Sequence, residues 1–226
     1  PLGLLKPEDL RNFGSTLDKS FSPGIKTLPR DLKKIVKEYD NVVREFNVDI
    51  EFYIISSGLL EIIEGSKFIR DNFSGIYASQ LGVDENGILS YIKRCITFTE
   101  KTRYLFEINK GISIEDTRKM PYLVNKKIPY EERRIPLSNF IYIGDGQTDV
   151  PCFSLLEQFG GKSFGVFNPK DKKSAKRALI EFIVPQRVSL GFYEPKYRKE
   201  DPLGSLLRLT VESRVSDIHV EKGVTR

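Results

Sequence analysis

The sequence predicts an α/β protein with a Rossmann-like, mainly parallel sheet and helices on both of its faces. The β-branched and aromatic residues 140–143 are typical of a buried strand, and a glycine-rich turn follows them at once. Apolar runs at residues 163–167 and 182–184 predict two more strands, separated by a basic helix. Upstream, apolar residues recur at intervals of three and four from 27 to 46, as in an amphipathic helix. Such alternation of strands and helices is what a doubly wound parallel sheet requires.

The N-terminal part is predicted to be helical. Residues 4–21 are expected to form a helical segment with a turn at Gly14-Ser15, and Pro23-Gly24 predicts a break. The amphipathic helix follows, with Thr27 as its N-cap, and we expect its apolar face to pack on the sheet.

A short serine-rich turn follows the next predicted strand, residues 50–55. Ser56, Ser57 and Gly58 separate this strand from a helix. A hydroxyl group at a strand-to-helix junction can bind a phosphate oxygen, and the first N–H groups of the helix add donors. The alternative is that Ser56 or Ser57 is only an N-cap.

The middle of the chain is predicted to contain a hairpin and a helix. A strand at 73–79 precedes a turn at 84–87, which lies between strand-like segments. A helix is expected to begin with Thr99 as its cap and to stop at Gly111. Residues 112–139 are polar, contain three prolines and predict an irregular excursion.

Lys101 lies in the first turn of that helix, where a cation opposes the helix dipole. This placement indicates that an anion lies opposite it. The alternative is an ordinary surface lysine paired with Glu100 or with solvent.

The stretch after strand 140–143 is the most specific signal in the chain. Gly144, Asp145 and Gly146 predict a tight turn, and a second acid follows at Asp149. Open α/β sheets bind their ligands at the carboxyl ends of central strands, where this turn is expected. The alternative is a surface turn, since Asp-Gly is a common turn pair.

Composition excludes several classes of protein. The apolar runs are too short to span a membrane, and with no leader segment at its start we expect a cytoplasmic protein. Two cysteines and one histidine are too few for a disulfide scaffold, a zinc site or Ser-His catalysis. A metal would therefore be a hard, oxygen-ligated ion such as Mg²⁺. The net charge of +5 is attributed to a solvated surface, and we do not expect nucleic acid binding.

Three segments resemble motifs of the haloacid dehalogenase (HAD) superfamily. FYIISSG, TEKTRYLF and GDGQTD are similar to its second, third and fourth motifs in order and rough spacing, and the resemblance extends over about 23–185. The phosphoserine-phosphatase-like members are the most similar. The resemblance implies a HAD-like α/β core at 23–212 and a helical-cap remnant at 1–22. Independently of it, residues 1–3 are similar to a tag scar, and the polar residues 213–226 are expected to form a tail.

The resemblance also implies roles for individual residues. Ser56 and Lys101 would bind the phosphoryl oxygens of a small phosphorylated substrate, and Ser57 and Gly58 would add backbone donors. Asp145 would ligate Mg²⁺, and Asp149 would support the metal site or position Lys101. Ser56, Lys101 and Asp149 thus form the expected catalytic set, with Asp145 and Asp149 as the metal residues.

One motif of the family is absent. No Asp-x-Asp, the motif that carries the family's nucleophile, occurs in the 226 residues. Its strand would lie between those that end at Ser56 and Gly144, so the sheet would have an unfilled position, for which 215–220 is a candidate. We expect either a phosphohydrolase acting through an aspartyl-phosphate, with its nucleophile outside this stretch, or a non-catalytic module of the same fold that binds an anion or a partner protein. The substrate and the oligomeric state do not follow from the sequence.

Overall fold

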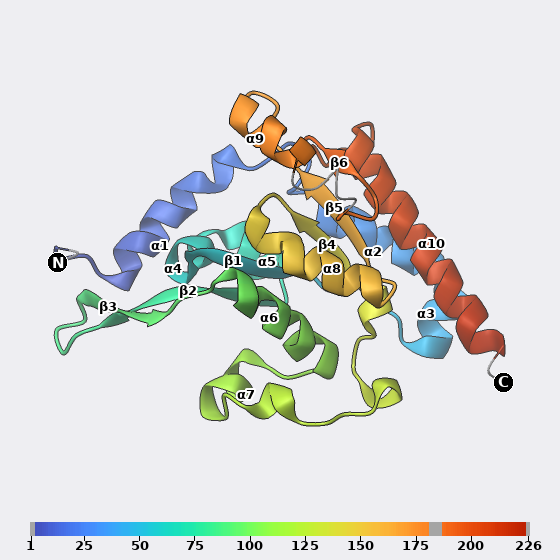
Figure 1. The fold of residues 1–226 in the computed structure, drawn as a ribbon, viewed down its shortest axis with the longest axis horizontal. Coiled ribbons are helices and arrows are strands. Elements are labelled where there is room, and N and C mark those ends of the chain that lie inside the picture. The colour runs from blue at the N-terminus through green and yellow to red at the C-terminus, as the bar shows by residue number, and fades with distance from the viewer. Residues whose placement is uncertain (1–2, 181–186, 225–226) are drawn as a thin grey trace. The chain divides into compact units, whose positions relative to one another are not determined.

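The computed structural model describes residues 3–180 and 187–224 and has a mixed α/β architecture with parallel-rich sheets (Figure 1). The chain divides into two compact units. One comprises Pro1–Asp18 and Tyr53–Phe192, and the other comprises Lys19–Phe52 and Tyr193–Arg226. Their borders differ from the expected ones after residues 22 and 212. Each unit is described by itself.

The first sheet of the larger unit has the order β1-β2-β3. Strand β1 (Tyr53–Leu59) pairs in parallel with β2 (Gly75–Val83), and β2 pairs antiparallel with β3 (Leu89–Arg94). The predicted turn between β2 and β3 is confirmed, because the Asp84 side chain accepts hydrogen bonds from the N–H groups of Asn86 and Ile88.

The second sheet has the order β4-β5-β6. Strand β4 (Ile141–Gly144) runs parallel to β5 (Lys162–Val166), and the third strand is β6 (Phe192–Tyr193). The predicted strands at 140–143 and 163–167 are confirmed within a residue or two. The predicted strand 182–184 lies outside the described residues.

Helix α1 (Pro7–Thr16) packs closely against α4 (Leu60–Gly65). A Cβ on Gly14 would lie 2.0 Å from the Ile62 carbonyl oxygen, so only glycine allows this approach. The predicted turn at Gly14-Ser15 is therefore wrong: α1 continues through both residues, and a 3₁₀ turn, Leu17–Ser20, follows it. Helix α5 (Lys67–Asn72) completes this region.

Helices α6 (Phe98–Lys110) and α8 (Val150–Gln158) cover a core that both sheets share. The buried members of this core come from α6, α8 and the segment before β4: Leu105, Leu137, Cys152 and Leu156. Ile55 of β1 and Tyr142 of β4 pack against them. Helix α6 ends at Gly111 as predicted, in the left-handed conformation. Its N-cap is Thr97, so the prediction of Thr99 is wrong; Thr99 lies inside the first turn.

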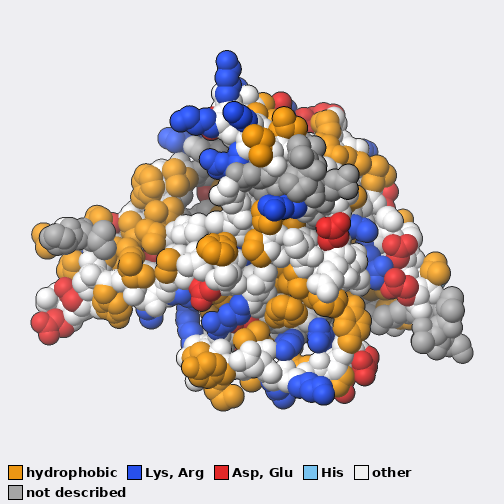
Figure 2. Space-filling view, in the orientation of Figure 1, with side chains coloured by type: hydrophobic (Ala, Val, Ile, Leu, Met, Phe, Trp, Pro, Cys, Tyr) orange, Lys and Arg blue, Asp and Glu red, His pale blue; other side chains and the backbone are white. Residues whose placement is uncertain are grey.

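The excursion between α6 and β4 is mostly irregular, as predicted. It contains one short helix, α7 (Ile114–Lys119), and three 3₁₀ turns, Leu123–Asn125, Tyr130–Glu132 and Leu137–Asn139. Beyond β5 lies the basic helix α9 (Lys172–Ala178), whose lysines are exposed and contribute to the basic surface at the top of Figure 2. Within the described part of the chain, no helix combines the length and the hydropathy needed to cross a bilayer.

Three α-helices make up most of the described part of the smaller unit. The single helix predicted at 27–46 is two helices, α2 (Leu28–Glu38) and α3 (Asp40–Phe46), because the chain leaves helical geometry at Tyr39. Thr27 is the N-cap residue of α2 as predicted, but its side chain makes no capping hydrogen bond. It adopts a helical conformation itself and donates to the Gly24 carbonyl instead.

The third helix, α10 (Pro202–Val224), packs against α2 and α3. The apolar face of α2 was expected on the sheet but packs in this unit. The suggestions of a strand at 215–220 and of a tail from 213 are also wrong, because α10 continues through both. Its buried residues recur at helical spacing: Leu203, Leu207, Val211, Val215 and Ile218.

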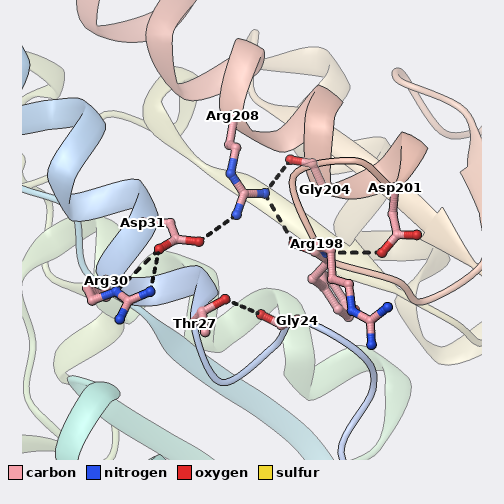
Figure 3. Close-up of polar contacts among 9 residues, drawn as sticks. Gly24, Thr27, Arg30, Asp31, Arg198, Asp201, Gly204 and Arg208 are labelled. Carbon is pink, nitrogen blue, oxygen red and sulfur yellow. Dashed lines mark hydrogen bonds and ion pairs between the residues drawn. The ribbon is translucent and has the colours of Figure 1, made fainter.

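A buried arginine joins α2 to α10. Figure 3 shows the Arg208 guanidinium between Asp31 of α2 and the first turn of α10. It donates to Asp31 at 2.8 Å and to the carbonyl oxygens of Gly204 at 2.7 Å and Tyr197 at 3.1 Å. Burial alone would raise the pKa of Asp31, but hydrogen bonds from Arg208 and Arg30 lower it below its ordinary value.

We predict that Asp31→Asn lowers the free energy of unfolding at neutral pH by about 1.5–3 kcal/mol, because Arg208 loses a charged acceptor. The folded-state pKa of Asp31 is depressed, so its contribution is present above the unfolded value, about 4, and is lost as pH falls through the folded value. Urea denaturation at pH 7 and pH 3 measures both effects. The control is Asp40→Asn, which removes an exposed ion pair with Arg44 and should cost under about 0.5 kcal/mol. Equal effects of the two variants would contradict the prediction.

Candidate active site

A buried ion pair lies between the start of α6 and the turn that follows β4. Lys101 Nζ is 2.7 Å from Asp149 Oδ1, and the two side chains are 7% and 5% exposed. Lys101 is in the first turn of α6, and Asp149 ends the 3₁₀ turn Gln147–Asp149. The lysine is therefore neither a surface residue nor a partner of Glu100, as one alternative held.

Asp149 also closes the glycine-rich turn. Its Oδ2 accepts the backbone N–H groups of Asp145 and Gly146, each at 3.1 Å. Its Oδ1 accepts the hydroxyl of Tyr142 at 2.6 Å in addition to Lys101. Because four donors occupy its two oxygens, the contacts of Asp149 correspond to positioning Lys101 and the turn rather than to coordinating a metal.

Among the residues that the structure describes, Lys101 has acceptors for two of its three N–H groups. Its ammonium has three N–H bonds, of which one goes to Asp149 and one to the Thr148 hydroxyl at 3.0 Å. The third N–H can donate to a further acceptor, while the charge of the ammonium is balanced by the Asp149 carboxylate. The structure thus places a fixed cation beside the turn at the end of β4.

Two more buried side chains, those of Tyr142 and Cys152, neighbour Asp149. Burial raises the pKa of Tyr142, and the neighbouring Cys152 and Asp149 raise it further. Burial likewise raises the pKa of Cys152 to about 12. Both groups therefore stay protonated at neutral pH, so the Tyr142 phenol remains a hydrogen-bond donor to Asp149.

Ser56, Ser57 and Gly58 lie in the last part of β1, not after it as predicted. Pairing with β2 shifts between Ser56 and Leu59, which indicates a β-bulge. Gly58 N–H donates to Ser56 Oγ at 3.0 Å, and Ser57 and Gly58 are exposed. Neither serine caps α4, whose N-cap is Leu59, so the N-cap alternative is wrong.

The predicted site residues come together only in part. Lys101 and Asp149 are in direct contact, and Asp145 joins them through its backbone N–H. Among the described residues, Ser56–Gly58 make no hydrogen bond with this group. The link is the common core: Ile55, next to Ser56, packs on the cluster that also contacts Tyr142.

The strands that carry these residues are open on one side. In the described part of the chain β1 pairs with β2 alone, and β4 pairs with β5 alone. The middle residues of β2 and β5 are buried, whereas the apolar residues of β1 and β4 are only half-buried. If β1 and β4 were inner strands of one continuous sheet, their residues would be the most buried. Their lower burial instead agrees with the strand orders, which place β1 and β4 at the edges of their sheets in the described chain.

Sequence reasoning missed Tyr142, Thr148 and Cys152. Tyr142 was counted only as an aromatic strand residue. A tyrosine within a buried strand usually needs a partner for its hydroxyl, and that need was the available signal. Thr148 lies one residue before Asp149 and could have been considered with it. Nothing in the sequence marks Cys152 as part of this group.

We predict that Gly144→Ala destabilises the protein, because a Cβ there would lie 2.7 Å from both Cβ and Cγ of Asp149. The expected loss is about 1–3 kcal/mol of unfolding free energy. Gly146→Ala is the matched control, since its Cβ would meet nothing closer than 3.6 Å, and it should change stability by under about 1 kcal/mol. Chemical denaturation measures the stability of the two variants. Equal stabilities would show that the contact between Gly144 and the Asp149 side chain is not close enough to exclude a Cβ.

Comparison with known proteins gives limited information. No known family model matches this sequence. The chain is similar to an uncharacterized protein of Borreliella burgdorferi (strain ATCC 35210), with 32% identity over 207 residues. The match covers 84% of this chain and spans 65% of the relative's length.

Proposed function

We propose that this chain is the phosphate-binding part of a phosphohydrolase with a HAD-like, Rossmann-like three-layer core. The observation that carries the proposal is the buried Lys101–Asp149 pair at the glycine-rich turn, with one lysine N–H left over. An ammonium group held in a fixed position with one N–H remaining is suited to an oxyanion, since a charge-assisted hydrogen bond is stronger than a neutral one.

The proposed substrate is a small phosphate monoester. Lys101 would bind one phosphoryl oxygen, and its charge would stabilise the transferring group, which is where most catalysis of this reaction lies. The Ser56 hydroxyl and the backbone N–H groups of Ser57 and Gly58 would bind the others, and the exposure of the last two supports this role. The nucleophilic carboxylate would come from outside this stretch.

The described residues do not by themselves fit a Mg²⁺ site. They contain no group of three or more acidic, histidine or cysteine side chains that could hold a metal. Asp145 is exposed, but both oxygens of Asp149 are occupied. Mg²⁺ therefore belongs to the proposal only together with a further carboxylate outside the chain, and Asp145 is the residue here that would join it.

The proposal predicts that Asp145→Asn in the full-length protein lowers Mg²⁺-dependent hydrolysis of p-nitrophenyl phosphate about a hundredfold or more. Asp145 is exposed, so the variant should fold normally. Glu157→Gln, an exposed acid on α8, is the control and should keep full activity. Full activity of the Asp145 variant would overturn the assignment.

A second candidate function is a non-catalytic module that binds a strand of a partner protein. The open edges of β1 and β4 favour it, because an unpaired edge is a template for β-augmentation. If this second function is correct, the Lys101–Asp149 ion pair only stabilises the turn, and the protein does not hydrolyse phosphate esters.

Hydrogen exchange distinguishes the two functions. In the 226-residue chain, amides of β1 and β4 should exchange about tenfold faster than those of β2 and β5, because alternate edge amides lack partners. If the full-length protein is the enzyme, its remaining segments should protect both edges. Edges that stay fast in the full-length protein, together with absent phosphatase activity, would favour the binding module.

A further inference from the structure

Tyr142 shares an acceptor with the proposed phosphate-binding lysine. We infer that Tyr142 is a positioning residue, which fixes the Lys101 ammonium for an oxyanion by donating its hydroxyl to Asp149. The inference rests on the proposed function, since it concerns the affinity of the same site. It adds a residue outside the glycine-rich turn to that site.

The geometry shows how the three groups act together. Tyr142 Oη and Lys101 Nζ lie 2.6 Å and 2.7 Å from the same oxygen, Asp149 Oδ1. The other oxygen is fixed by two backbone N–H groups. The carboxylate is thus held on both sides, and the direction in which it accepts from Lys101 is set by its other partners.

The phenol is itself held firmly. Its ring makes an edge-to-face contact with Phe153, with centroids 5.7 Å apart and planes at 81°, and its backbone is in register with Ser163 of β5. Phe153 is fully buried. Removing only the hydroxyl would leave these packing contacts intact, so a phenylalanine should occupy the same place.

Removing the Tyr142 hydroxyl is expected to alter the orientation of the Lys101 ammonium. With Tyr142 present, its ammonium is directed by Asp149 and Thr148, and its third N–H has a fixed direction. Without the phenol, Lys101 is the one described side-chain donor to Asp149 Oδ1, so a second donor no longer sets the direction of the hydrogen bond between them. The site would keep its charge but lose the fixed geometry that favours an oxyanion.

The test measures inorganic phosphate binding to the full-length protein by calorimetry, for wild type, Tyr142→Phe, Tyr104→Phe and Lys101→Gln. Tyr104 is the matched control, because it is a buried tyrosine on α6 that contacts Tyr77 rather than Asp149. We expect Tyr142→Phe to weaken phosphate binding about tenfold and Tyr104→Phe to leave it unchanged. The ¹⁵N signal of the Lys101 ammonium should move in Tyr142→Phe only, which a purely structural role would not produce.

The outcomes separate the inference from the proposed function. If Lys101→Gln weakens binding while Tyr142→Phe behaves like Tyr104→Phe, the positioning role is wrong and the phosphate site stands. If Lys101→Gln binds phosphate as wild type does, or wild type does not bind it, the proposed function fails and the inference fails with it. Weakening by both Lys101→Gln and Tyr142→Phe, with the moved lysine signal, supports the inference.

Discussion

The buried ion pair between Lys101 and Asp149 is the constraint on which the candidate site depends. Two charges at this depth are stable only when each is paired and hydrogen-bonded, and every contact described for them meets that need. Removing one partner would leave the other charge buried. The pair also fixes two elements distant in sequence, because α6 and the turn after β4 meet through it.

The second feature of this site is that β1 and β4, the strands that carry its residues, each have an unpaired edge in the described chain. Both sheets share one core, yet their facing strands are not paired with each other in the described chain. The half-buried isoleucines of these strands leave apolar surface that a further strand would cover.

Much of the fold followed from the sequence, because local patterns determine it. Strand β4 and the stop at Gly111 were predicted from a short apolar run and one glycine. The errors lie where tertiary contacts decide: Gly14 indicated a turn but permits close helix packing, and Tyr39 interrupts an apparently continuous helix. The resemblance drew attention to both Lys101 and Asp149, and the structure brings the two side chains into contact. The contact of Tyr142 with Asp149 depends instead on which way a strand residue points and on its neighbour across the turn, which the sequence does not show.

The central claim is that an oxyanion binds at this turn, and a phosphate titration followed by backbone ¹H–¹⁵N chemical shifts tests it most directly. The account predicts that the largest changes occur at the amides of Asp145, Gly146, Ser57 and Gly58, with the Lys101 side chain moving at the same phosphate concentration. Changes confined to the basic helix α9, or no saturable change at these residues, would contradict it.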